Sequence, residues 1–100
     1  DTDSSRARGL MGVDYLGENE GMIFFWPSAS KKCMWMKNTN LPLSVAFIDQ
    51  DRTIVQIDHL QPFSTDSVCS RSERIIAAIE MNKDWFEANG LKEGSQVKLN

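Results

Sequence analysis

Short apolar runs, separated by polar and turn-forming segments, dominate this sequence, and the pattern predicts strands joined by hairpins. Residues 43–49 are apolar on both alternating faces, which is typical of a central strand buried on two sides. Residues 53–60 alternate instead, with Val55 and Ile57 on one face and polar residues on the other. The other expected strands are residues 22–26, 33–36, 74–81 and 96–99.

Proline and polar residues set the expected ends of these strands. Pro27 should end the first strand, because proline cannot donate a hydrogen bond to a neighbouring strand. Residues 49–52 should form the hairpin turn after the central strand, and residues 61–72 a polar loop. One face of the strand at residues 74–81 should carry Ile75, Ala77, Ile79 and Met81.

Two short helices are expected, one near each end of the chain. Residues 4–11 carry apolar residues spaced three and four apart, and Gly12 follows as a stop signal. Near the other end, Asn82 should cap a helix that stops at Gly90. These elements predict an α+β fold: a small, mostly antiparallel, β-barrel-like sheet of five to six strands with a short helix near each end. A β-sandwich is the second architecture.

The composition restricts the class of protein. A chain of 100 residues predicts one domain, with residues 1–5 as a flexible tail. A net charge of −3 argues against nucleic acid as a partner, and no apolar run approaches the roughly 20 residues that span a bilayer. We expect a monomer. The sequence begins at Asp1 without a methionine, so either a removed secretory signal or a shortened expression product would explain its start.

Two cysteines, Cys33 and Cys69, lie 36 positions apart. Neither belongs to a Cys-x-x-Cys pair, and the single histidine cannot complete a tetrahedral zinc site with them. Two unrelated buried thiols and one disulfide both fit this spacing. A disulfide would imply an oxidising compartment.

Several blocks together resemble the family known as domain of unknown function 192, and the match covers nearly the whole chain. The most specific block is Met36-Lys37-Asn38-Thr39, which is preceded by Trp35 and followed by Pro42. The other blocks are Arg8-Gly9-Leu10-Met11, residues 21–25, residues 45–49 and residues 90–94, with Arg74 and Glu80 before the last.

This resemblance implies a compact, β-barrel-like α+β domain that bacteria usually carry behind a secretory or lipoprotein signal. It also implies a disulfide between Cys33 and Cys69 and a periplasmic or secreted location. The family has no established catalytic residues. One departure concerns the hairpin turn, where Asp51-Arg52-Thr53 replaces the usual glycine, so a longer or different turn is expected.

The polar stretch after residue 36 is the main candidate site. Lys37 would supply positive charge to an anionic or polyhydroxylated ligand, Asn38 and Thr39 would supply hydrogen bonds, and Arg8 would be a second cation. The alternative is structural, with Asn38 and Thr39 bonded to local backbone. We therefore expect a non-enzymatic binding module for a polar ligand, such as carbohydrate or cell-envelope material, or for a partner protein.

Two other functions stay open. A small hydrolase or transferase could use His59 with a carboxylate. An exposed His59 in a concave pocket, with a shifted pKa, would favour this function, although we expect His59 to be partly buried. Cu(I) binding through Met34, Met36 and His59 is the weaker alternative, because methionine in a core usually fills gaps. No resident metal or cofactor is expected.

Overall fold

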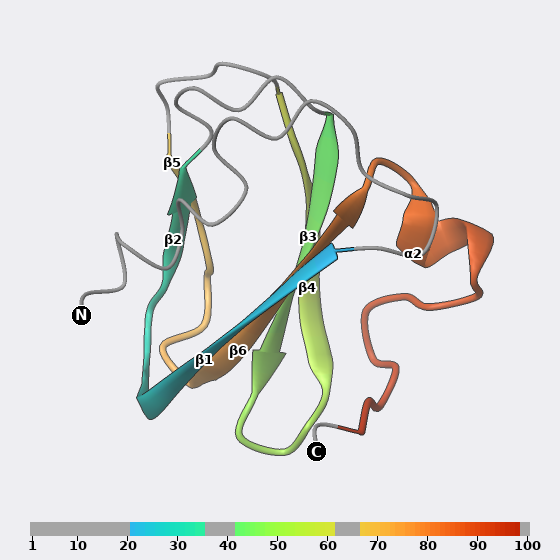
Figure 1. The fold of residues 1–100 in the computed structure, drawn as a ribbon. Coiled ribbons are helices and arrows are strands. Elements are labelled where there is room, and N and C mark those ends of the chain that lie inside the picture. Colours follow the sequence, from blue (N-terminus) through green and yellow to red (C-terminus); the bar gives the residue numbers. More distant parts are fainter. Residues whose placement is uncertain (1–20, 36–41, 62–66, 99–100) are drawn as a thin grey trace.

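The computed structural model describes residues 21–35, 42–61 and 67–98, and within these ranges it contains six strands and one short helix (Figure 1). The elements are β1 (Gly21–Ser30), β2 (Cys33–Trp35), β3 (Leu43–Asp49), β4 (Ile54–Leu60), β5 (Ser67–Cys69), β6 (Ile75–Asn82) and α2 (Trp85–Ala88).

The strands form two separate antiparallel sheets. One has four strands in the order β1-β6-β3-β4, and the other pairs β2 with β5. Within the described residues the sheets do not close into a barrel, so the barrel-like prediction is wrong, whereas the prediction of five to six mostly antiparallel strands is confirmed. β5 lies within residues 61–72, so the polar loop expected there is wrong for Ser67–Cys69. The layered arrangement is closer to the sandwich, the second architecture considered (Figure 1).

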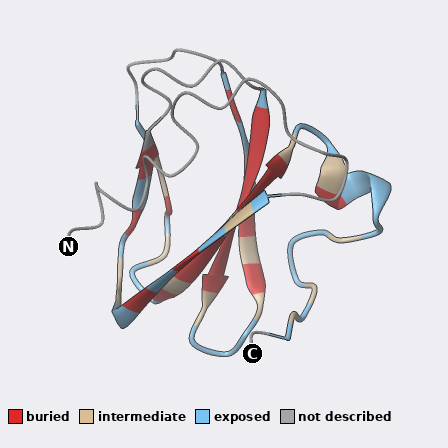
Figure 2. Ribbon diagram, viewed as in Figure 1, coloured by how far each residue is buried: buried red, intermediate tan, exposed pale blue. Residues whose placement is uncertain are grey.

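Two hydrophobic cores lie on opposite faces of the four-stranded sheet. The inner core, which the β2–β5 sheet covers, comprises Phe24, Trp26, Met34, Leu43, Val45, Phe47, Leu60, Ile75 and Ala78. The outer core, which α2 covers, comprises Ala46, Ile48, Ile54, Ala77, Met81 and Phe86. Strand β3 contributes to both cores and is buried along its length, as Figure 2 shows, which confirms the predicted central strand.

Two strands contain a register shift that the alternating pattern did not predict. Val55 of β4 packs against the inner core and Ile57 against the outer core, although they were expected on one face. In β6, Ile75 belongs to the inner core and Ala77 to the outer core, with Ile76 as the extra residue between them. An extra residue in one strand of an antiparallel pair reverses the facing of every later side chain.

Strand β1 continues past Pro27, which was expected to end it. This strand lies at one edge of the four-stranded sheet, where a proline need not donate a ladder hydrogen bond. The pairing of β1 with β6 shifts between Phe25 and Ser30, the segment that contains Pro27. The proline therefore interrupts the pairing and leaves the strand intact.

The turn between β3 and β4 is tight and is held by one carboxylate. Asp49 Oδ1 accepts hydrogen bonds from the backbone N–H groups of Asp51 (2.9 Å) and Thr53 (3.1 Å). Arg52 adopts a left-handed conformation with φ of 64°, and its N–H donates to the Asp49 carbonyl. The predicted hairpin is confirmed, and Arg52 takes the positive-φ position that a glycine would otherwise favour.

Helix α2 begins two residues later than expected. Asp84, with φ of 68°, occupies the N-cap position instead of Asn82. Gly90, with φ of 74°, follows the helix as predicted, and the N–H of Leu91 donates to the Phe86 carbonyl at 2.8 Å. This hydrogen bond holds the segment that follows α2 against the outer core, which includes Phe86.

The two terminal predictions have different outcomes. The helix expected at residues 4–11 lies outside the described residues. In place of the strand expected at residues 96–99, the described part has one isolated bridge between Gln96 and Thr53. No helix in the described part of the chain is long and apolar enough to cross a membrane.

Candidate functional site

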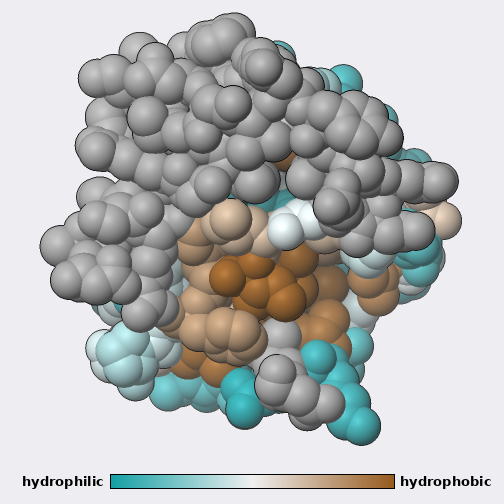
Figure 3. All heavy atoms as spheres, viewed as in Figure 1, coloured by the Kyte–Doolittle hydropathy of each residue, from teal (hydrophilic) through white to brown (hydrophobic). Residues whose placement is uncertain are grey.

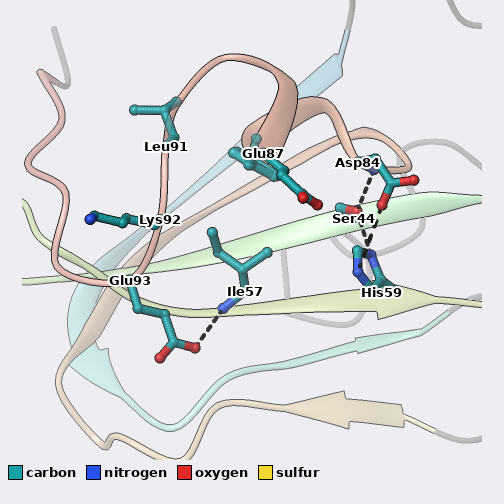
Figure 4. A pocket seen from close by; sticks show the side chains of 9 residues that line it. Ser44, Ile57, His59, Asp84, Glu87, Leu91, Lys92 and Glu93 are labelled. Carbon is teal, nitrogen blue, oxygen red and sulfur yellow. Dashed lines mark hydrogen bonds and ion pairs between the residues drawn. The ribbon is translucent and has the colours of Figure 1, made fainter.

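All four residues that the sequence proposed for ligand binding, Arg8, Lys37, Asn38 and Thr39, lie outside the described residues. The described candidate site is instead built around His59. It combines Ser44 of β3, His59 of β4 and Asp84 at the start of α2 (Figure 4). Ser44 and His59 are directly paired residues of neighbouring strands, so their side chains emerge on the same face of the sheet.

These three residues are joined by close polar contacts. Ser44 Oγ lies 2.8 Å from His59 Nδ1, within hydrogen-bond distance. The backbone N–H of Asp84 donates to the same hydroxyl oxygen at 3.1 Å. His59 Nε2 lies 3.8 Å from Asp84 Oδ1, which is ion-pair distance when the imidazole is protonated. The contacts tie the beginning of α2 to the two strands beneath it.

A cavity of about 230 Å³ opens beside this group, and we call it the His59 pocket. Its apolar lining is Ile57, Phe86 and Leu91. Its polar lining is Ser44, His59, Asp84, Glu87, Lys92 and Glu93. Figure 4 shows Glu87 directed toward the Ser44–His59 side and Lys92 directed away from it. The pocket thus combines an apolar surface with the contacts of Ser44, His59 and Asp84 at one end, and with Lys92 and Glu93 at the other (Figure 4).

The exposure of the two central side chains limits the possible chemistry. Ser44 is only 1% exposed, and its hydroxyl oxygen already contacts both His59 and the Asp84 N–H. The His59 side chain is 51% exposed, so the prediction that it is partly buried beside the core is wrong. The cause is topological, because β4 is an edge strand and His59 lies one residue before its end.

The proposed copper ligands do not come together. Met34 is fully buried in the inner core, whereas His59 is exposed on the opposite face of the four-stranded sheet, so these two residues cannot share a metal ion. Met36 lies outside the described residues. Among the residues that the structure describes, no group of three His, Cys, Asp or Glu side chains could hold a metal ion.

A buried carboxyl group lies on the inner face of the four-stranded sheet. Glu80 of β6 is almost fully buried, and the loss of water contact raises the pKa of its carboxyl from 4.5 to about 8. Val45 pairs with Glu80 on one side and with Asp58 on the other, so the two carboxyl groups share a face with one strand between them. Arg74 does not pair with Glu80, because its guanidinium lies 3.6 Å from Asp51.

The two cysteines are joined as the family resemblance implied. The Cys33–Cys69 disulfide links β2 to β5 at directly opposed positions of the small sheet. Next to it, the Cys69 carbonyl accepts a hydrogen bond from Gln56 Nε2 at 3.1 Å. Through Gln56, the disulfide-linked sheet is also attached to β4 of the larger sheet.

Comparison with known proteins agrees with the motif blocks. The family model DUF192, described as an uncharacterized ACR, matches residues 1–99. The chain belongs to the DUF192 family. None of the curated proteins with which the sequence was compared matches it.

Two crystal structures show the same fold. One is described as a candidate transcription regulator from Sinorhizobium meliloti 1021, with 32% identity and a TM-score of 0.87 over 93% of this chain and 72% of that one. The other is a protein of unknown function from Novosphingobium aromaticivorans DSM 12444, with 31% identity and a TM-score of 0.86 over 93% of this chain and 66% of that one.

The sequence identified His59 as a possible site residue but did not identify Ser44 and Asp84 as its partners. Ser44 is the one hydroxyl inside the apolar run of residues 43–49. A polar side chain in a central strand needs a hydrogen-bond partner, and this signal marks Ser44. The position of Asp84 depends on how α2 folds back over the sheet, and the alternating pattern does not contain that information.

Proposed function

We propose that this DUF192 domain binds a small polar ligand in the His59 pocket without converting it chemically. The observation that carries the proposal is the buried Ser44 hydroxyl, which is engaged by His59 and by the Asp84 N–H. Because Ser44 is only 1% exposed, it makes a fixed wall for a ligand and is poorly placed to attack one, although a contact with histidine is also what activates a nucleophilic serine.

The surface of the pocket fits a ligand with both apolar and hydrogen-bonding parts. Ile57, Phe86 and Leu91 provide apolar contact, and the exposed imidazole of His59 offers a ring nitrogen to the solvent side. Sugars and other cell-envelope building blocks combine such surfaces. The disulfide is compatible with an oxidising compartment, so the proposal includes a periplasmic or secreted location.

Binding to nucleic acid, which the description of the Sinorhizobium relative suggests for that protein, is not adopted for this chain. Its net charge of −3 disfavours close contact with phosphates. The described pocket is lined by the carboxylates of Asp84, Glu87 and Glu93 and by one lysine, Lys92, so it offers no cluster of basic side chains for a phosphate group.

The test is an amide chemical-shift titration of the 15N-labelled domain with glucose, glucosamine, N-acetylglucosamine and inorganic phosphate. We expect saturable shifts at Ser44, Ile57, His59 and residues 84–93 with at least one of the sugars. The His59→Gln variant should weaken this binding, and the Ser30→Ala variant, on β1 and outside the pocket lining, should not. Saturable shifts only elsewhere in the domain would contradict the proposal.

A second candidate function is hydrolysis assisted by His59, and one observation favours it. His59 is exposed in a concave pocket with the Asp84 carboxylate 3.8 Å away, which meets the exposure and pocket parts of the criterion set from the sequence. Hydrolysis of p-nitrophenyl acetate by the wild type, His59→Gln and Ser44→Ala decides this point. Turnover above that of free imidazole, abolished in both variants, would replace the binding proposal.

A further inference from the structure

An apolar groove of about 390 Å³ lies next to the His59 pocket on the same face of the sheet. Its lining includes Ile23, Ile54, Ile79, Met81, Trp85 and Val97. Phe86 and Leu91 line both cavities, so the groove and the pocket adjoin at these two side chains. Figure 3 shows hydrophobic side chains gathered on this side of the molecule, in the region where β1 lies in the view of Figure 1.

The groove presents apolar side chains at the surface of the protein. Ile23 is 51% exposed on edge strand β1, and the groove that it lines is open to solvent. Ile79, Trp85, Leu91 and Val97, which also line the groove, are half-buried, so the apolar surface there is continuous and larger than one exposed side chain. The pocket at the other end is charged, because Asp84, Glu87, Glu93 and Lys92 line it. Glu93 lies 3.7 Å from Arg71, and Lys92 is directed away from the end where Asp84 and Glu87 lie, so these two carboxylates set the charge there (Figure 4).

This contrast defines the chemistry of the occupant. A molecule that fills both cavities needs an apolar part in the groove and a positively charged group beside Asp84 and Glu87. We propose that the ligand is a single-chain cationic amphiphile, with its amine in the His59 pocket and its hydrocarbon chain across Leu91 in the groove. This inference rests on the proposed function and specifies the ligand class of the same site.

The amine and the hydrocarbon chain contribute differently to binding. An amine beside exposed carboxylates gains little binding free energy in water, because solvent screens the attraction between the charges. Hydrocarbon burial supplies most of the affinity, since each buried CH₂ group contributes about 0.8 kcal/mol. The carboxylates then set the preference for a cationic over an anionic head group, by attraction to one and repulsion of the other.

The test compares three probes below their micelle-forming concentrations: dodecylammonium, butylammonium and dodecanoate. Binding is followed by Trp85 fluorescence, with Trp85→Phe as the reference, and by the nuclear magnetic resonance signal of His59. We expect dodecylammonium to bind at least roughly a hundredfold more tightly than butylammonium, and roughly threefold to tenfold more tightly than dodecanoate. It should move the His59 signal and the fluorescence together, because it reaches both cavities.

Two matched pairs of variants show where the hydrocarbon chain and the amine of the probe bind. Ile23→Ser should weaken dodecylammonium binding, whereas Phe25→Ser, at an exposed residue of the same strand outside the groove lining, should not. Glu87→Gln should reduce the preference for dodecylammonium over dodecanoate, whereas Glu73→Gln should leave it unchanged. All four residues are exposed or line an open surface, so these variants should fold.

The outcomes separate this inference from the proposed function. Equal affinity for butylammonium and dodecylammonium, with the His59 signal moving in both titrations, overturns the amphiphile and leaves polar-ligand binding in place. Equal affinity for dodecanoate and dodecylammonium overturns the cationic head group. No change of the His59 signal with any of the three probes, or with the sugars, contradicts both.

Discussion

Glu80 gives the fold a stability that depends on pH, and its replacement by glutamine tests this. The side chain is 2% exposed on β6, and burial raises the pKa of its carboxyl from 4.5 to about 8. Between these two values the folded protein holds a proton that the unfolded chain releases. The stabilisation from protonated Glu80 is therefore complete below pH 4.5 and is lost as the pH rises through 8.

The magnitude follows from the two pKa values. Since one pKa unit corresponds to about 1.4 kcal/mol, the free energy of unfolding should fall by about 2.5 kcal/mol between pH 5 and pH 7 on account of this group. Glutamine has nearly the same shape and does not titrate. Glu80→Gln should therefore remove this part of the pH dependence and stabilise the protein near pH 7 by about 2–3 kcal/mol.

The assay is urea denaturation followed by tryptophan fluorescence at pH 5, 6, 7 and 8. Exposed Glu73→Gln serves as the control and should keep the wild-type pH dependence. The difference in the free energy of unfolding between wild type and Glu80→Gln, taken at each pH, separates the contribution of Glu80 from that of the other titrating groups. Parallel curves for these two proteins would refute the reasoning, because they would mean that Glu80 titrates alike in the folded and unfolded chain.

Three further predictions concern the disulfide, the Ser44 contacts and a close approach at Gly21. Replacing Cys33 and Cys69 together by serine should lower the free energy of unfolding by about 3–4 kcal/mol, measured by urea denaturation; a loss below about 1 kcal/mol would contradict the cross-link's role. Ser44→Ala should cost about 1–3 kcal/mol in thermal unfolding, because it leaves the Asp84 N–H without this acceptor, whereas Ser30→Ala should be nearly neutral. Gly21→Ala should cost about 1–3 kcal/mol, because its Cβ would overlap Met81 Sδ and the Glu80 carbonyl oxygen; unchanged denaturant unfolding would show that β1 can shift freely.

Much of the four-stranded sheet could be read from the sequence because its central strand is unusually apolar. Residues 43–49 are apolar on both faces, and β3 occupies this range and contacts both cores. The turn at residues 49–52 and the stop at Gly90 could also be predicted, since both depend on local backbone preferences. These features arise from neighbouring residues, which sequence patterns represent well.

The predictions that were wrong concern features that depend on contacts between distant segments of the chain. The extra residues Val55 and Ile76 change which face of their strands is buried, and strict alternation cannot show where such a shift occurs. Pro27 was expected to end β1 because the sequence did not show that this strand lies at an edge. The barrel was wrong for a similar reason, as closure depends on which strands pair.

The candidate site was only partly predictable. His59 was noted as a possible functional residue, but its exposure follows from the edge position of β4 and its partner Asp84 from the return of α2. The polar residues that drew most attention, Arg8, Lys37, Asn38 and Thr39, lie outside the described residues, so their role in binding stays a prediction.

The measurement that tests the account most directly uses the fact that His59 is the only histidine in the sequence. Its Cε1–H signal in a 1H–13C correlation spectrum needs no assignment and reports on the pocket alone. During titration with dodecylammonium or glucosamine we predict a saturable movement of this signal, reduced in Glu87→Gln and unchanged in Glu73→Gln. A His59 signal that stays fixed while amide signals elsewhere in the domain saturate would contradict ligand binding in this pocket.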